Sequence, residues 1–232
     1  MKKFLFLFLG LVLGVIGCVN GSDVLDAVNK MGELDNYKMV VSATADFSIE
    51  GYDFSMKIIM DSDVDEKNDV AKMITTVEFA DEKETAESYM MFDGNKTITY
   101  TEMFGDWYKT TEPTISEEEM FEILKNVETV DKTTSGDITE YKVKLSGKDV
   151  EKLMGDMQME EMSISFGETE FIIHVNKDGY ITKMTLDLPM NMDFDGYIVS
   201  TTIKFNYTFS KFNQVGNIAI PQNIIDNAIT SD

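Results

Sequence analysis

The chain has 232 residues, a formal net charge of −22, one cysteine and one histidine. So acidic a chain is excluded as a nucleic-acid binder, because phosphates require a basic surface. It is also excluded as a protein with a polybasic face for anionic lipid. A single cysteine rules out an internal disulfide. Hydrophobic residues make up 43% of the chain, which is enough to build a globular core.

The first 17 residues have the layout of an export signal. Lys2 and Lys3 precede an unbroken apolar run over residues 4–16. This run is shorter than the roughly 20 apolar residues of a transmembrane helix. We therefore expect residues 1–17 to be a signal peptide that is removed. A buried core helix is the alternative, although the run has neither a polar face nor capping residues.

The residues that end this run are more specific. Residues 15–18 read Val-Ile-Gly-Cys, which resembles the lipobox of prokaryotic lipoproteins. In that class the cysteine carries a thioether-linked diacylglycerol, and a fatty acid such as palmitate can follow. The resemblance implies lipidation of Cys18, a tether over residues 18–22, and a cell-membrane protein facing away from the cytoplasm. The alternative is an ordinary signal peptide in which Cys18 is discarded. Residues 23–232 should then form one domain, which we expect to be a monomer.

The first half of the domain begins with a helix and continues as strands. Ser22 or Asp23 can cap a helix whose apolar residues lie three or four apart as far as Leu34. The apolar period then changes to two, as in strands with one buried face. Glycine and Asx turns separate these strands. The alternation predicts strands over residues 39–49, 54–60, 73–79, 89–92, 97–103 and 107–108.

The second half mixes helices with further strands. Ser116 and Glu119 have the spacing of a capping box, which predicts a helix over residues 116–127. A short helix is expected near residues 149–154. Strands are predicted over residues 138–145, 163–175, 180–188, 199–209 and 217–220, before a short C-terminal helix around residues 224–229. The pattern predicts one α+β domain, a curved antiparallel half-barrel of about nine to eleven strands closed by a few helices.

Several short sequence motifs resemble those of a known group of secreted proteins. Residues 92–96 contain an aspartate-glycine turn, and residues 105–109 read Gly-Asp-Trp-Tyr-Lys. Residues 178–181 contain a second aspartate-glycine turn, and residues 218–221 end in isoleucine and proline. This pattern resembles the LolA/LolB carriers and the LppX/LprG lipoproteins. The resemblance implies a LolA-like half-barrel over an apolar cavity that holds a lipid or another hydrophobic ligand. The chain departs from this group in having no arginine, so a mechanism that uses cavity arginines is not implied.

The strand alternation also indicates which side chains would line such a cavity. We expect the ligand to lie between the sheet and the 116–127 helix. Methionine, of which there are 17, suits a surface that adapts to varied apolar ligands; a methionine-rich core without a ligand is the alternative. The candidate cavity residues are Met56, Ile58, Met60, Val77, Phe79, Tyr100, Phe121, Leu124, Val143, Phe171, Ile173, Met184, Ile203 and Phe205.

Other candidate sites are weaker. His174 lies alone in a strand pattern, without the partners that a catalytic triad or a zinc site requires. Residues 61–65 and 191–196 look like calcium loops, but each lacks an essential EF-hand residue, and solvated turns are the simpler interpretation. A thioether cluster could attract Cu(I), although a flexible apolar segment explains it as well; it comprises Met154, Met157, Met159 and Met162.

These patterns favour a non-enzymatic, membrane-anchored binding protein with no metal and no cofactor. Two other functions remain open. One is a structural, interaction or sensor lipoprotein with a packed core and no ligand. The other is a hydrolase, which would need a site built around His174.

Overall fold

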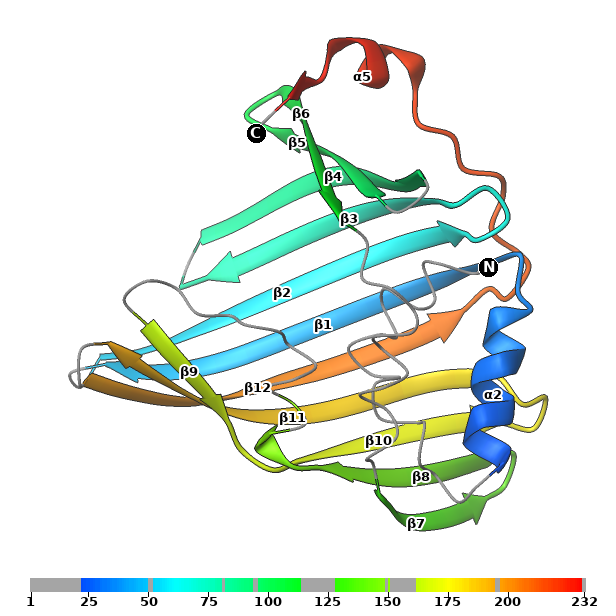
Figure 1. Ribbon diagram of the computed structural model, residues 1–232, viewed down its shortest axis with the longest axis vertical. Coiled ribbons are helices and arrows are strands. Elements are labelled where there is room, and N and C mark those ends of the chain that lie inside the picture. Colours follow the sequence, from blue (N-terminus) through cyan, green and yellow to red (C-terminus); the bar gives the residue numbers. More distant parts are fainter. Residues whose placement is uncertain are drawn as a thin grey trace.

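The structure, a computed structural model, describes residues 22–49, 52–80, 82–93, 96–113, 128–148, 150, 162–194 and 197–230. These residues form one sheet with helices α2 (Ser22–Gly32) and α5 (Gln222–Asn227) beside it (Figure 1). The strands are β1 (Asn36–Ile49), β2 (Tyr52–Asp65), β3 (Val70–Phe79), β4 (Glu82–Asp93), β5 (Lys96–Met103), β6 (Asp106–Pro113), β7 (Glu128–Ser135), β8 (Ile138–Leu145), β9 (Met162–Phe166), β10 (Thr169–Asn176), β11 (Ile181–Phe194), β12 (Tyr197–Ser210) and β13 (Ile229–Thr230).

The sheet joins two antiparallel meanders. Its order is β13-β6-β5-β4-β3-β2-β1-β12-β11-β10-β8-β7, and β9 pairs with β11 beside this path. The strand β12 returns to lie antiparallel to β1, so the first and last long strands meet at the middle of the sheet. The short β13 is parallel to β6. The result is an open, curved, mostly-β structure (Figure 1).

The main core lies between α2 and one face of the sheet, here called the inner face. The expected N-terminal helix is confirmed as α2, and its stripe of Ala27, Val28 and Met31 is buried in this core together with Leu34, which follows the helix. Strand residues of the same cluster come from both meanders and include Met39, Val64, Ile173, Met184 and Phe209. Packing of the helical stripe on the sheet therefore joins the two meanders into one unit.

A second, smaller cluster lies on the opposite, outer face of the sheet. Tyr89, Tyr100 and Ile224 are buried there, with Trp107 and Ile220 packed against them. The chain after β12 reaches this cluster by crossing the strand ends. On the way the Asn213 N–H donates to the Asn36 carbonyl at 2.8 Å, and the Ile218 N–H donates to Asp65 Oδ2 at 3.1 Å. The last part of the chain thus covers the outer face of β4–β6.

The described residues form more strands than the sequence predicts, 13 rather than nine to eleven. β7 was not expected because its sequence ETVDKTTS has little apolar alternation. The predicted strand over residues 163–175 is divided into β9 and β10 around Gly167, whose N–H donates to the Pro189 carbonyl at 2.9 Å. Residues 217–220 are not a strand, because they serve as cover for the outer cluster.

Residues 61–65 are not a solvated turn. They end β2, and Asp65 and Glu66 beyond it are buried. The predicted helix at 116–127 lies outside the described residues, as does most of the helix near 149–154. Of the latter, Val150 is buried and its N–H donates to the Ser146 carbonyl at 3.1 Å.

Candidate functional site

The strand register arranges the candidate cavity residues in continuous rows across the inner face. Side chains directly opposite one another on paired strands share a face. One row crosses seven strands from β3 to β8, and a second and a third run beside it. The first row is Val77, Ile58, Ala43, Phe205, Leu186, Phe171 and Val143. The second is Thr75, Met60, Val41, Tyr207, Met184, Ile173 and Tyr141. The third is Phe79, Met56, Ala45, Ile203 and Leu188.

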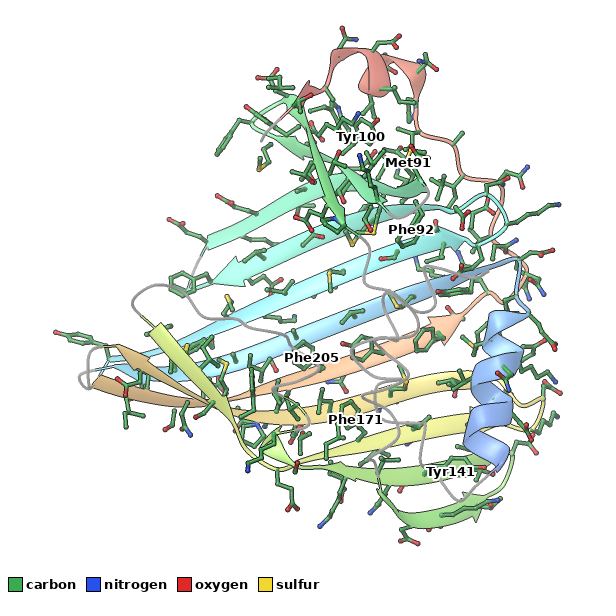
Figure 2. All side chains as sticks on the ribbon, in the orientation of Figure 1. Met91, Phe92, Tyr100, Tyr141, Phe171 and Phe205 are labelled. Carbon is green, nitrogen blue, oxygen red and sulfur yellow. The ribbon has the colours of Figure 1, made fainter. Side chains whose placement is uncertain are left out.

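One half of these rows is fully covered and is here called the closed half. It comprises Tyr141, Val143, Phe171, Ile173, Met184, Leu186 and Tyr207, all at most 4% exposed. They belong to the cluster that includes the buried stripe of α2. Figure 2 shows Tyr141 and Phe171 over β8 and β10, on the side of the sheet where α2 lies. The closed half is therefore core rather than ligand-lining surface.

The other half of the same rows is only partly covered and is here called the open half. Its members are half-buried or exposed, and Phe79 is 47% exposed. Met60, Ile203 and Phe205 still pack against the main core, so the open half is continuous with it. It comprises Met56, Ile58, Met60, Val77, Phe79, Ile203 and Phe205. An apolar strip left in this condition is the surface that a hydrophobic ligand would cover.

Two further aromatic rings, of Phe47 and Phe54, extend the open half toward the tip of the β1–β2 hairpin. The Phe47 and Phe54 rings are stacked with centroids 5.2 Å apart, and Phe54 meets Phe79 edge-on at 5.6 Å. Phe47 and Phe54 are cross-strand partners one step beyond the third row. Next to them the β1–β12 pairing ends at Ala45 and Ile203. Beyond that point the Thr201 hydroxyl donates to the Asp46 carbonyl at 2.7 Å.

A shallow depression of about 390 Å³ lies where β1 and β12 diverge. It is lined by Asp46, Ser48, Asp53, Ser55 and Ser200 beside the two phenylalanines. The Ser200 hydroxyl donates to Asn191 Oδ1 at 2.7 Å. Because five of its seven lining residues are polar, the ligand is assigned to the open half rather than to this depression.

Two buried tyrosines are shielded from water: Tyr207 of the closed half, and Tyr37 of the same cluster on the inner face. Burial raises the pKa of Tyr207 to about 12. Burial also raises the pKa of Tyr37, and the nearby Glu66 carboxylate raises it further. The Tyr37 hydroxyl donates to Glu66 Oε1 at 3.2 Å. Both shifts favour the neutral phenol, as expected for a hydroxyl removed from water.

The remaining candidates of the sequence lie elsewhere. Tyr100 is buried in the outer cluster, on the face opposite the three rows, and Figure 2 places it with Met91 near β4 and β5. Phe121 and Leu124 lie outside the described residues. The Nε2 of His174 is 3.3 Å from Glu140 Oε2 across β8 and β10, also on the outer face.

Within the described ranges, no group of three or more histidine, cysteine, aspartate or glutamate residues is placed to hold a metal ion. No described helix has the length and apolar character needed to cross a bilayer. The methionine cluster at 154–159 is outside these ranges, and Met162 begins β9.

The family model described as "Family of unknown function (DUF6612)" matches residues 23–229. The chain is a member of DUF6612. No functionally curated protein is significantly similar to it. The matched residues include both clusters, all three rows and every described strand except Thr230, the last residue of β13.

The solved structures that are similar to this DUF6612 chain have low sequence identity to it and low TM-scores. A putative outer membrane lipoprotein-sorting protein domain from Vibrio parahaemolyticus is 8% identical, covers 87% of this chain and 95% of its own, and has a TM-score of 0.30. A LolA superfamily protein from Nitrosomonas europaea is 11% identical, covers 88% and 95%, and has a TM-score of 0.28. A beta-barrel-like DUF1849 protein from Brucella abortus is 8% identical, covers 73% and 97%, and has a TM-score of 0.30.

Phe47 and Phe54 were not among the site residues that the sequence of this DUF6612 chain suggested. The signal was present, because both continue the period-two alternation of their strands: Phe54 precedes Met56 and Ile58 on the same face. What the sequence could not show is that the two rings stack across the β1–β2 hairpin. That contact depends on the register of the pair.

Proposed function

We propose that this DUF6612 protein is a membrane-anchored, extracytoplasmic binding protein that holds a lipid or another hydrophobic ligand against the open half. The observation that carries the proposal is the burial gradient along single rows. Phe171 and Leu186 are 2% exposed, whereas Phe205 and Ile58 in the same row are only half-buried. An apolar row that extends past the part buried in the core leaves apolar side chains that a hydrophobic ligand can cover.

The chemistry of the open half favours an acyl chain over a polar ligand. Its side chains are aliphatic, aromatic or thioether, and Met56 and Met60 can adapt to ligands of different shape. An acyl chain gains about 0.8 kcal/mol for each methylene removed from water. The closed half supplies a rigid base, because its residues are packed against α2. Binding would then add cover to the existing core rather than build a new one.

The location and anchoring belong to the same proposal. The Val-Ile-Gly-Cys sequence at residues 15–18 supports lipidation of Cys18, and these residues lie outside the described part of the chain. A diacylglycerol at Cys18 would hold the domain at the membrane, facing outside the cytoplasm, as a monomer. Membrane attachment would come from this anchor rather than from charge, since a net charge of −22 repels anionic lipid.

We also propose that the protein is not an enzyme. His174, the only histidine, lies half-buried on the outer face beside Glu140, away from the three rows. His174→Ala should therefore leave the amount of bound ligand unchanged. A loss of any hydrolytic activity of the purified protein on replacing His174 would contradict this part of the proposal.

A matched pair of neighbouring isoleucines tests ligand binding. Ile58 faces inward beside Ala43 and Val77, whereas Ile59 faces outward beside Ser42 and Thr76, and both are half-buried. Full-length protein is purified from membranes and its non-covalent ligands are identified by native mass spectrometry. We expect Ile58→Asn to lose bound lipid and Ile59→Asn to retain it.

Two outcomes would contradict the proposal. One is a wild-type protein that is consistently empty after purification without detergent exchange, which would favour a packed interaction lipoprotein. The other is equal loss of lipid from both isoleucine variants. Circular dichroism of both variants serves as the control for folding, and Ile58→Val, which keeps the apolar character, should retain the lipid.

A further inference from the structure

The hairpin between β5 and β6 carries a phenylalanine in an unfavourable place. Phe104 has φ 56° and the following Gly105 has φ 87°, and Met103 pairs with Asp106 across the turn. Two central residues with positive φ are typical of a type I′ turn, in which asparagine and glycine are strongly preferred. A bulky residue with positive φ is a conformational outlier. The Phe104 side chain is nevertheless 100% exposed, so no contact within the chain explains it.

Other exposed apolar side chains gather at the same corner. Ile229 of β13 lies opposite Tyr108 in a parallel pair with β6. Because the pair is parallel, the end of α5, which precedes Ile229, lies on the same side as the β5–β6 turn, which precedes Tyr108. Figure 1 shows α5 and this turn at the same end of the molecule. Met103 is 44%, Ile225 41% and Ile229 49% exposed. We call Met103, Phe104, Ile225 and Ile229 the apolar corner.

We propose that the apolar corner inserts into the surface of a neutral lipid bilayer, as a contact separate from the expected anchor at Cys18. It does not depend on ligand binding to the open half. Trp107, the only tryptophan, and Tyr108 follow the turn directly and are half-buried. Tryptophan and tyrosine are the side chains that settle at the level of lipid headgroups.

The size of the corner argues for a bilayer rather than a protein. Its four side chains expose on the order of 400 Å². A stable protein interface buries roughly 800 Å² on each partner, so the corner is about half of what a second copy would need. A deformable bilayer surface has no such threshold, because each inserted apolar side chain adds to the attachment that a lipid anchor already provides.

The charges around the corner select the kind of lipid. Glu102 and Asp106 flank the turn and Asp226 lies in α5, whereas Lys109 is the nearest cation on β6. The Lys109 ammonium lies 5.9 Å from the Tyr100 ring centroid, over the outer cluster. This local excess of negative charge favours zwitterionic headgroups over anionic ones.

Trp107 provides the readout for a direct test. Full-length protein purified from membranes is reconstituted into phosphatidylcholine vesicles with and without brominated acyl chains. We expect bromine to quench the emission of Trp107 in the wild type, and to do so less in vesicles rich in phosphatidylglycerol at low salt. Phe104→Asn should lose the quenching. The control is Tyr52→Asn, which removes another exposed aromatic side chain, 78% exposed at the β1–β2 turn, and should keep it.

Stability separates insertion from a structural role. Asparagine suits the left-handed conformation at position 104, so Phe104→Asn should raise the unfolding midpoint while it abolishes quenching. A fall in the midpoint together with lost quenching would assign Phe104 to the fold and overturn the proposal. Quenching that persists in Phe104→Asn, or is lost equally in Tyr52→Asn, would overturn it as well. So would a wild-type dimer that Phe104→Asn dissociates, because a second copy would then occupy the corner.

Discussion

The closed and open halves of the inner face are built from the same strands and the same alternation, yet they differ in cover. Phe171 and Phe205 lie in one row on either side of Leu186, but only Phe171 is fully buried. The difference lies in what packs above them. The closed half belongs to the cluster that includes α2, whereas the open half lies at its edge. Alternation decides which face is apolar, and the covering element decides whether that face is core or surface.

The lengths of the elements account for part of this difference. α2 has 11 residues, which corresponds to about 16 Å of helix. β1, β2, β11 and β12 have 14 residues each, which corresponds to roughly 46 Å of strand. A helix of this length covers only part of the strands beneath it. The remaining part needs another cover, and under the proposed function this cover includes the ligand.

The largest expected effect compares the two phenylalanines that flank Leu186. Phe171→Ala removes a ring that is 2% exposed, so we expect it to lower the free energy of unfolding by about 3–5 kcal/mol. Phe205→Ala removes the same group from a half-buried position, and its cost should be about half as large. Urea titrations of ligand-free protein measure both. Equal costs would mean that the open half is as tightly packed as the closed half.

The next effect is alkaline destabilisation through the closed half. The pKa of Tyr207 is about 12 in the folded protein, compared with an ordinary value of 10.0. The folded state keeps the proton at a pH where the unfolded state loses it. The contribution is therefore complete below pH 10 and is lost as the pH rises through 12, by about 1.4 kcal/mol per pH unit. Tyr37, whose pKa is also raised, adds a slope of the same sign.

Substitution of Tyr207 measures how much this residue contributes to the loss of stability with rising pH. Tyr207→Phe should flatten the fall in the urea midpoint above pH 10, leaving the part due to Tyr37. Tyr52→Phe, at an exposed hairpin tip, should leave the fall unchanged. If Tyr207→Phe leaves the alkaline slope as steep as in the wild type, the closed half is more accessible to water than its burial indicates.

A smaller effect concerns the hydrogen bond at the edge of the closed half. Tyr37→Phe keeps the ring, whose centroid is 6.1 Å from that of Phe209, and removes the hydroxyl that donates to Glu66. We expect a loss of about 1–2 kcal/mol, since the hydrogen bond has a carboxylate partner. Thermal unfolding at neutral pH measures it. An unchanged midpoint would show that Glu66 is equally well satisfied without Tyr37.

The smallest effect on stability is expected within the open half. Val77→Ala removes two methyl groups from a half-buried position on β3, and the cost should stay below about 1 kcal/mol in ligand-free protein. With ligand bound, the same change should lower the retained lipid. Val41→Ala, at a site 1% exposed, is the matched change in covered core, and it should cost more stability. The reverse order would contradict the division into two halves.

Much of the fold could be predicted because most of its long strands have one apolar face. The helix at α2 and the approximate positions of β1 to β3, β5, β8, β11 and β12 follow from local sequence patterns, whereas only residues 89–92 of β4 were predicted. β7 and β13 could not be found in this way. β7 is a polar edge strand, and β13 has two residues whose pairing with β6 depends on the route of the C-terminal segment. That route is set by contacts such as Ile218 with Asp65, which are far apart in sequence.

The residues of the candidate site could likewise be predicted only in part. Alternation is sufficient to bring Met56, Ile58 and Met60 to one face, and the register carries that face across to Phe171. It is not sufficient for Tyr100, because the neighbouring β4 has apolar residues on both faces, and Tyr100 pairs with the outer ones, which pack beneath the C-terminal segment. A two-sided strand gives no local signal of which face meets which cover.

The sequence by itself determined the acidic charge, the lipobox-like Val-Ile-Gly-Cys and the apolar side of each long strand, since these depend on residues within a few positions of one another. Only the tertiary structure decided that the rows join across seven strands, that α2 covers one half of them, and that the chain end covers the outer face. These features depend on strand order and on contacts between distant residues, and a local pattern carries neither.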